Sequence, residues 1–325
     1  YDLAEDSPCA YARWSNPTTQ MLETKIAALQ GSEACVCTAS GMAAASAIFL
    51  TFLSAGDHAV VSDVSYAGVA ELARDTLPRL GIEVTTVNMS DLAAVADAIR
   101  PNTKVFFFET PANPTLDVVD LAHVCAVARA HGITTVVDNA FATSALQRPL
   151  EFGANVVAYS ATKLMDGQGR VLAGAVCGTE EFITETLLPF QRNTGPNLAP
   201  FNAWVVLKGL ETLDMRARRQ SENALEVGRF VEERVLKAGG RILHPGLPSH
   251  PRHDMALRQM AMTGPIFAWD LPGGRAQAFA LLDALALVDI SNNIGDSRSL
   301  LCHPASTTHA NMGEDGRAEM GVTEG

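Results

Sequence analysis

Short apolar runs alternate with segments of helical spacing along the first two thirds of the chain. Most of these runs are apolar at nearly every position, as in KVFFFET (104–110). Such strands are buried on both faces, and their alternation with helices is typical of a parallel sheet that helices cover on both sides. The pattern therefore predicts an α/β fold with a mostly parallel sheet. The expected strands are 58–63, 82–88, 104–110, 134–140, 155–163 and 170–178.

The segments between these strands carry the start and stop signals of helices. Ser90 is a candidate N-cap for the helix that follows it, and Gly132 stands where a helix would end in the left-handed conformation. Ser40 and Gly41 interrupt the chain just before an Ala-rich run. The expected helices are 67–80, 91–100, 120–131 and an Ala-rich one within 38–53.

The pattern changes after residue 196. Residues 201–239 have the spacing of one or two long helices, a Pro- and His-rich loop follows at 244–253, and further strands are expected near 266–271 and 287–291. This mixture predicts a second, smaller α+β domain. The expected organisation is an N-terminal segment 1–37, a main domain 38–205 and a C-terminal domain 206–325.

Composition and charge narrow the class of protein. The chain has 325 residues, 47% of them hydrophobic, and a formal net charge of -12. That composition excludes a disordered chain, and the charge excludes a basic nucleic-acid footprint. No apolar run reaches the ~18–20 residues of a membrane helix, and the first residues have no signal-peptide pattern. The six cysteines form no paired CxxC sets of a zinc site. Cys125 and Cys177 lie inside apolar runs, as free thiols do, so we expect a reducing compartment and a cytoplasmic protein.

Polar and titratable residues stand where several of the apolar strands end. Ligands of open parallel sheets bind outside the carboxyl ends of the strands, so these residues form a candidate site. Two acidic side chains, one lysine, one amide and two hydroxyl groups meet there. The residues concerned are Glu109, Asn113, Asp138, Ser160, Thr162 and Lys163.

A second element of this site is the turn at Ser40, Gly41 and Met42. Free N–H groups at a helix N-terminus bind phosphate well. A phosphate cradle, an acid and a lysine together suit pyridoxal 5'-phosphate (PLP), because the amine of Lys163 can bind the aldehyde carbon and Asp138 can keep the ring nitrogen protonated. Singly these signals are weak, since a lysine is usually a surface charge and an aspartate often caps a helix. The chain has only five lysines, however, and this one follows a buried strand.

Other chemistries fit the sequence less well. His244, His250 and His253 lie in a proline-rich loop, and their spacing matches no standard metal site. Neither GxGxxG nor GxxxxGK[ST] occurs, which disfavours a nucleotide-binding loop. We therefore expect no metal.

Five segments of the chain resemble motifs of the Cys/Met-metabolism family of PLP-dependent enzymes. They are YARWSNPT (11–18), TASGMAA (38–44), ETPANPTL (109–116), VVDNAF (136–141) and YSATKLMDGQGR (159–170). The resemblance spans nearly the whole chain and implies the fold of a fold type I PLP-dependent transferase. It also implies that the family's C-terminal strand, with an arginine for the substrate carboxylate, lies beyond Gly325.

The resemblance implies a role for each candidate residue. Lys163 would carry the cofactor, Asp138 would hold its ring nitrogen, Tyr66 would stack on the ring, and Asn113 would approach the ring oxygen. The phosphate would be bound by Ser40, Gly41, Met42, Ser160 and Thr162 of one subunit and by Tyr11 and Arg13 of its neighbour. The resemblance thus implies dimers that share active sites, paired into a homotetramer.

The segment GQGR (167–170) stands where the family's cystathionine enzymes usually have GHSD. This variant resembles the branch that replaces the γ-substituent of an activated homoserine ester by sulfide. The implied partners are an amino-acid ester and sulfide, and the products would be homocysteine and succinate. The alternatives to this reaction are replacement by cysteine, use of the acetyl ester, γ-elimination by water, and a catalytically silent homologue.

One residue departs from the family's pattern. Ala140 stands in the place of the family's threonine and cannot supply a hydroxyl beside the ring.

Overall fold

The computed structural model describes residues 11–325. Within this part of the chain a seven-stranded sheet forms the centre, in the order β1-β7-β6-β5-β4-β2-β3. The five neighbouring strands β3, β2, β4, β5 and β6 pair in parallel, whereas β7 runs antiparallel to both of its neighbours, β1 and β6. The predicted α/β fold with a mostly parallel sheet is confirmed. The strands are β1 (Ala34–Thr38), β2 (His58–Ser62), β3 (Glu83–Val87), β4 (Thr103–Glu109), β5 (Thr134–Asp138), β6 (Val156–Ser160) and β7 (Gly174–Gly178).

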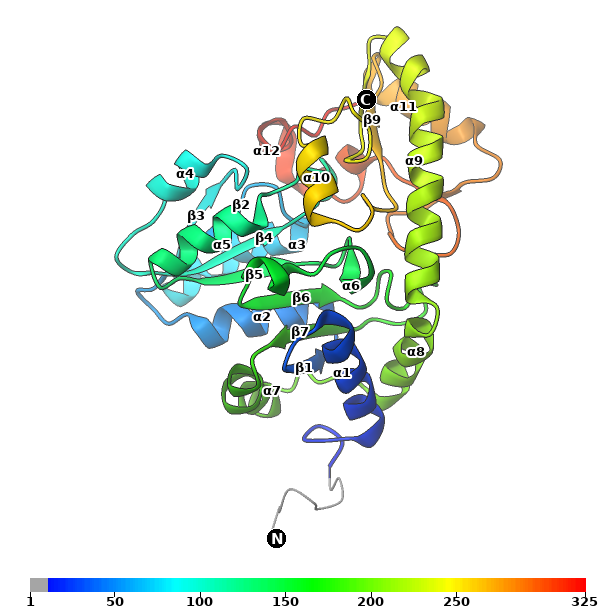
Figure 1. Cartoon of the computed structure of the whole chain (residues 1–325). Coiled ribbons are helices and arrows are strands. Elements are labelled where there is room, and N and C mark those ends of the chain that lie inside the picture. The colour runs from blue at the N-terminus through cyan, green and yellow to red at the C-terminus, as the bar shows by residue number, and fades with distance from the viewer. Residues whose placement is uncertain (1–10) are drawn as a thin grey trace.

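Helices cover both faces of this sheet, as the continuous burial of residues 105–109 in β4 requires (Figure 1). Val105 and Phe107 pack with α2, α3 and α7 on one face. Phe106 and Phe108 pack with α4 and α5 on the other face, where α1 covers the β1 end. The helices of this domain are α1 (Pro17–Gln30), α2 (Gly41–Phe52), α3 (Ala67–Glu71), α4 (Leu92–Asp97), α5 (Leu121–Ala130), α6 (Thr143–Leu146) and α7 (Leu188–Thr194).

Three local expectations differ from the structure. Asp91, not Ser90, caps α4, because its carboxylate accepts the N–H groups of Ala93 and Ala94. The helix expected over 67–80 divides into α3, a π-helical turn and a 3-10 turn that begins at Pro78. The strand expected from residue 170 begins only at Gly174.

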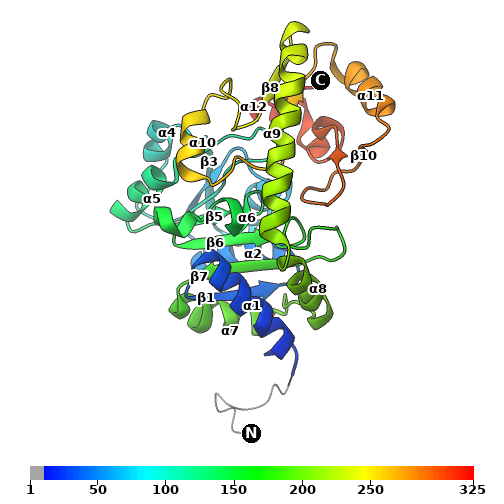
Figure 2. The same ribbon diagram turned by 45° about the vertical axis from the view of Figure 1, so that its right-hand side comes forward.

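The C-terminal part is built around one long helix, α9 (Leu213–Lys237), which stands beside the sheet in Figure 2. The expected helical region 201–239 is two helices, with α8 (Pro200–Leu210) preceding α9. Two small two-stranded sheets follow, β8 with β9 and β10 with β11. The elements after α9 are β8 (Arg241–Leu243), α10 (His253–Gln259), β9 (Ala268–Asp270), α11 (Gly274–Ala284), β10 (Asp289–Ile290), β11 (Leu300–Leu301) and α12 (Gly313–Glu319).

Candidate active site

The carboxyl ends of β4, β5 and β6 bring the candidate residues to one edge of the sheet. Glu109 and Asp138 are direct partners in the register of β4 and β5. Asp138 pairs in turn with Ala158 of β6, two residues before Ser160. Lys163 then follows on a turn, residues 161–167, that we call the lysine turn. Leu164 of this turn accepts a hydrogen bond from Arg216 of α9 at 2.8 Å, so the turn lies beside that helix.

The amine of Lys163 is half-buried in this edge. Its Nζ donates to Oδ1 of Asn293 at 2.9 Å, a contact across 130 positions of sequence. Burial lowers the pKa of the amine, and the carboxyl group of Glu109 acts in the opposite direction. A lysine whose pKa is lowered gives up its proton more readily, as a nucleophile or a general base requires.

Glu109 and Asp138 form a buried pair of carboxyl groups. Burial and the charge of Asp138 raise the pKa of Glu109 well above its ordinary value, although the backbone N–H groups of Tyr66 and Asn113 donate to its carboxyl. Burial raises the pKa of Asp138 only to about 6, since the N–H of Ala140 donates to its Oδ1 at 3.0 Å. Of the two carboxyl groups Glu109 therefore holds its proton more strongly, and Asp138 ionises first.

This charge makes Asp138 a pH-dependent element of the cofactor-free protein. Its folded pKa is raised, so its contribution to stability is full below pH ~4 and is lost as the pH rises through about 6. Asp138→Asn has no charge to bury. We expect the cofactor-free variant to match the wild type at pH 4 and to exceed its free energy of unfolding by about 3 kcal/mol at pH 8. Urea unfolding at the two pH values measures this difference. Equal stabilities at pH 8 would show that the buried charge of Asp138 does not destabilise the cofactor-free protein.

The start of α2 forms a cradle beside the lysine turn. Ser40 caps the helix, with its Oγ accepting the N–H of Ala43 at 3.1 Å. A Cβ on Gly41 would come within 2.7 Å of the Cβ of Ser160, so only glycine lets the helix N-terminus approach β6 this closely. The helix is twelve residues long, and its first N–H groups have no partner within the helix. The cradle thus suits a phosphate group.

The other predicted residues have mixed positions. The ring of Tyr66 and the sulfur of Met42 lie together against Gly68, next to the cradle. The hydroxyl of Thr162 exchanges hydrogen bonds with the backbone of Ala173, at 3.0 and 3.1 Å, and thereby closes the lysine turn onto the residue before β7.

Tyr11 and Arg13 are not brought to this site within the described chain. The guanidinium of Arg13 lies 5.2 Å from the ring centroid of Tyr11 and donates to the backbone oxygen of Arg192 on α7. The Tyr11 side chain is exposed. Both residues precede α1, at the lower end of the molecule in Figure 1.

Sequence reasoning missed Asn293. The only signal was a polar run, Ser291-Asn292-Asn293, directly after the strand expected near 287–291. Nothing in the sequence places that run beside a lysine 130 positions earlier in the chain. In the structure the loop packs tightly on the lysine turn, since a Cβ on Gly295 would lie 2.5 Å from the backbone nitrogen of Leu164.

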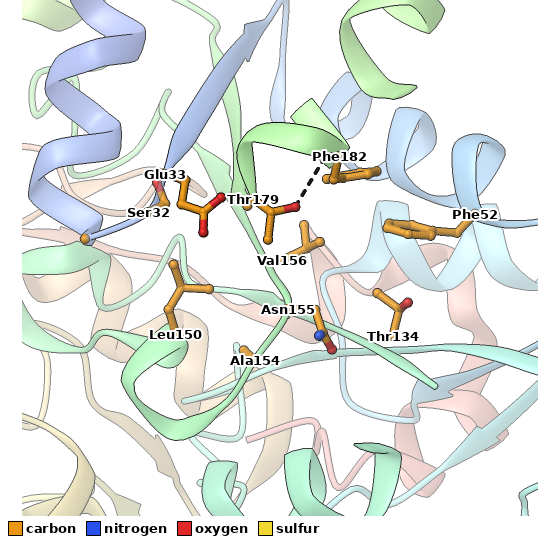
Figure 3. Close-up of a pocket in the computed structure, with 12 residues that line it drawn as sticks. Ser32, Glu33, Phe52, Thr134, Leu150, Ala154, Asn155, Val156, Thr179 and Phe182 are labelled. Carbon is orange, nitrogen blue, oxygen red and sulfur yellow. Dashed lines mark hydrogen bonds between the residues drawn. The ribbon is translucent and has the colours of Figure 1, made fainter. Parts of the chain in front are cut away.

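A separate cavity of about 360 Å³ lies at the opposite edge of the sheet (Figure 3). Its walls include Thr134 and Val156, which begin β5 and β6, and a stacked pair of rings from Phe52 and Phe182. The carboxylate of Glu33 already accepts the N–H of Glu180 at 2.9 Å. Since this is the amino-terminal edge of the parallel strands and holds no lysine, the reactive groups lie elsewhere.

The described residues offer neither a cluster of metal ligands nor a helix that could span a membrane. No group of three or more His, Cys, Asp or Glu side chains in this part of the chain could hold a metal ion. No helix among the same residues is long and apolar enough to cross a membrane.

The chain is similar to several characterised proteins. The family model described as "Cys/Met metabolism PLP-dependent enzyme" matches residues 3–325. O-succinylhomoserine sulfhydrylases of Pseudomonas aeruginosa and Mycobacterium tuberculosis are 43% and 42% identical, over 96% and 97% of this chain and 77% and 78% of theirs. An L-methionine gamma-lyase of Porphyromonas gingivalis is 38% identical, over 99% of this chain and 80% of its own length.

Two solved structures have the same fold as this chain. The crystal structure of metB from Corynebacterium glutamicum superposes with a TM-score of 0.94 at 34% identity, covering 99% of this chain and 82% of that one. A cystathionine gamma-lyase from Lactobacillus plantarum, complexed with L-serine, gives a TM-score of 0.93 at 32% identity, covering 100% of this chain and 84% of that one.

Proposed function

Because the chain belongs to the Cys/Met metabolism family of PLP-dependent enzymes, we propose that it replaces the succinyl group of O-succinyl-L-homoserine by sulfide, giving L-homocysteine and succinate. Its cofactor is pyridoxal 5'-phosphate. The observation that carries the proposal is the convergence of Lys163, Asp138 and the α2 N-terminus at one edge of the sheet, in a chain 42–43% identical to two O-succinylhomoserine sulfhydrylases.

The residues at this edge fit the cofactor. The α2 N-terminus, open because Gly41 has no side chain, would hold the phosphate together with Ser40, Met42 and Ser160. Thr162 would bind the phosphate beside them through its hydroxyl, which in this structure donates to the backbone oxygen of Ala173. Asp138 would accept a hydrogen bond from the protonated ring nitrogen, which would also lower the pKa of this buried carboxyl. Lys163 would hold the cofactor's aldehyde carbon.

Tyr66 and Asn113 would contact the ring from two different loops. Both loops donate a backbone N–H to Glu109, so this buried carboxyl ties them to the end of β4. The raised pKa of Glu109 favours its neutral form, and this matters for Asp138, because a second negative charge beside that residue would raise its pKa and weaken its hold on the ring nitrogen.

When bound, the cofactor supplies an electron-poor ring that stabilises negative charge at the substrate α-carbon. Lys163 removes the α-proton and returns a proton later, and the lowered pKa of its amine suits this alternation. Asn293 holds the amine between these steps. Removal of a proton from the β-carbon then lets succinate leave the γ-carbon with its bonding electrons, so that a double bond forms between Cβ and Cγ. Hydrosulfide (HS⁻) adds to Cγ as a proton returns to Cβ.

A matrix of two esters and three acceptors tests the proposal. We expect kcat/KM for O-succinylhomoserine with sulfide to exceed that for O-acetylhomoserine, or for cysteine in place of sulfide, by about 10-fold or more, or about 1.4 kcal/mol. With water alone, 2-oxobutanoate should form slowly. Faster release of 2-oxobutanoate from methionine would instead identify a γ-lyase, and no turnover with any pair would indicate a silent homologue.

We also propose that two copies of the chain share their active sites, as dimers within a homotetramer. The packed helices α1 and α8 expose Met21, Phe201 and Trp204, with exposed fractions of 61%, 68% and 52%. Both helices lie at the same end of the molecule as the segment that precedes α1 (Figure 1). Large apolar side chains exposed on neighbouring elements mark an interaction surface. A second copy docked there could receive the planar guanidinium of Arg13, which suits a phosphate.

Mixing two inactive variants tests this sharing. In a dimer of one Lys163→Ala and one Arg13→Ala subunit, one of the two sites has both wild-type residues. Co-refolding equal amounts should therefore restore about a quarter of wild-type activity, because half of the dimers are mixed. Mixed dimers that form but stay inactive would place the whole phosphate site within one chain.

A further inference from the structure

The side of α9 that faces the lysine turn carries Arg216, each of whose three guanidinium nitrogens donates one hydrogen bond. Nη1 of Arg216 donates to the backbone oxygen of Leu164 at 2.8 Å, and Nη2 donates to that of Gly209 at 2.8 Å. Nε donates to Oγ1 of Thr212 at 3.0 Å. The planar guanidinium thus has one orientation, and one of its three partners is the residue that follows Lys163.

The lysine turn is shaped to receive this guanidinium. Gly167 ends the turn with φ +76, and any Cβ on it would overlap the guanidinium of Arg216. Gly209, at the end of α8, likewise packs on the backbone oxygens of Met165 and Asp166, where a Cβ would collide. Two glycines therefore let the turn sit directly between α8 and α9.

One helical turn further along α9, Gln220 supports the loop that carries Asn293. Its Nε2 donates to the backbone oxygen of Asp296 at 2.9 Å. Residues at positions i and i+4 project from the same face of a helix, so Arg216 and Gln220 act side by side. The first holds the backbone beside Lys163, and the second holds the backbone beside Asn293.

The charges around Arg216 are also balanced. The side chain of Asp166 is fully buried and accepts from Nε of Arg170 at 2.9 Å. Burial lowers the pKa of Arg216, whereas the charge of Asp166 opposes that effect. An arginine keeps its proton regardless. Removal of Arg216 would leave the oxygens of Leu164 and Gly209 without this donor.

We infer that Arg216 is a positioning residue for Lys163, acting with Gln220 to fix the distance between the lysine amine and Asn293. The inference rests on the proposed role of Lys163 as the cofactor lysine. Arg216 has no hydrogen bond to Lys163 itself within the described chain; it acts through the backbone of Leu164. Each active site is therefore set by the face of α9, which belongs to a different part of the sequence from every residue that would touch the cofactor.

Arg216→Ala in the full-length enzyme tests the inference, with Arg218→Ala as the matched control. Arg218 lies two positions further along the same helix and is exposed, and among the described residues it pairs only with Asp214. We expect Arg216→Ala to lower kcat about 30-fold, or about 2 kcal/mol, with KM changed less than about 3-fold. Millimolar methylguanidinium should restore much of this loss, whereas the control should stay at wild-type activity with or without it.

A second readout does not depend on the substrate. The rate at which added PLP becomes attached to Lys163, followed by its absorbance after removal and return of the cofactor, should fall in Arg216→Ala and recover with methylguanidinium. If no ester is turned over even by the wild type, the proposed reaction is wrong but this rate still tests Arg216.

A milder variant covers the case in which Arg216→Ala does not fold. Gln220→Met removes only the bond to Asp296, and it should lower kcat about 5-fold and slow attachment, with the wild-type midpoint of unfolding retained to within a few degrees. The inference is overturned if the folded variants keep wild-type kcat and attachment rate and lose only thermal stability. Equal losses in the Arg218→Ala control would overturn it as well.

Discussion

Lys163→Ala is expected to lower kcat/KM by about 1,000-fold or more, or about 4 kcal/mol. The variant loses both the amine that would hold the cofactor and the group that would move the α-proton. The fold should persist, because the side chain is only half-buried and its one hydrogen bond within the described part of the chain is to Asn293. Steady-state production of homocysteine measures the loss.

Lys208→Ala is the matched control for this variant. Lys208 lies on α8, is about half exposed and pairs with Glu211 on the surface, so its removal should leave activity unchanged. Lys163→Arg should be nearly as inactive as Lys163→Ala, since an arginine does not lose its proton. A Lys163→Ala enzyme with a tenth of wild-type activity would contradict the assignment.

Asp138→Asn should lower kcat/KM by at least ~100-fold, or about 2.7 kcal/mol. Asparagine has nearly the same shape, and its Oδ1 can still accept the N–H of Ala140. It lacks the charge that holds a proton on the ring nitrogen. The same substitution is expected to stabilise the cofactor-free protein at pH 8, so catalysis and stability should change in opposite directions.

Glu109→Gln serves as the control for charge at this pair. Burial and the neighbouring charge of Asp138 raise the pKa of Glu109 and so favour its protonated form. A neutral amide should then replace it with less than about a 3-fold change in kcat/KM, because it still offers an oxygen to the N–H of Tyr66. If Glu109→Gln lost as much activity as Asp138→Asn, the catalytic charge would belong to Glu109.

The sequence predicted those parts of the site that depend on local pattern. Continuous apolar strands made the parallel sheet visible, and Glu109, Asp138 and Ser160 were found because each ends such a strand. Parallel strands bring their carboxyl ends to one edge, so their meeting followed from topology alone.

Contacts between distant segments could not be predicted in this way. Asn293 and Arg216 reach the lysine turn from 130 and 52 positions away, through packing of the C-terminal part against the sheet. Strand β1 was also missed, because its five residues gain strand character from antiparallel pairing with β7 rather than from a long apolar run. Whether Arg13 reaches a neighbour's phosphate depends on a second chain.

The attachment site of the cofactor is the central claim, and reduction tests it directly. Treating the PLP-loaded enzyme with borohydride fixes the cofactor on whichever lysine holds it, and peptide mapping then identifies that residue. The account predicts a pyridoxyl group on Lys163 alone among the five lysines of the chain. A label on Lys25, Lys104, Lys208 or Lys237, with Lys163 unmodified, would contradict it.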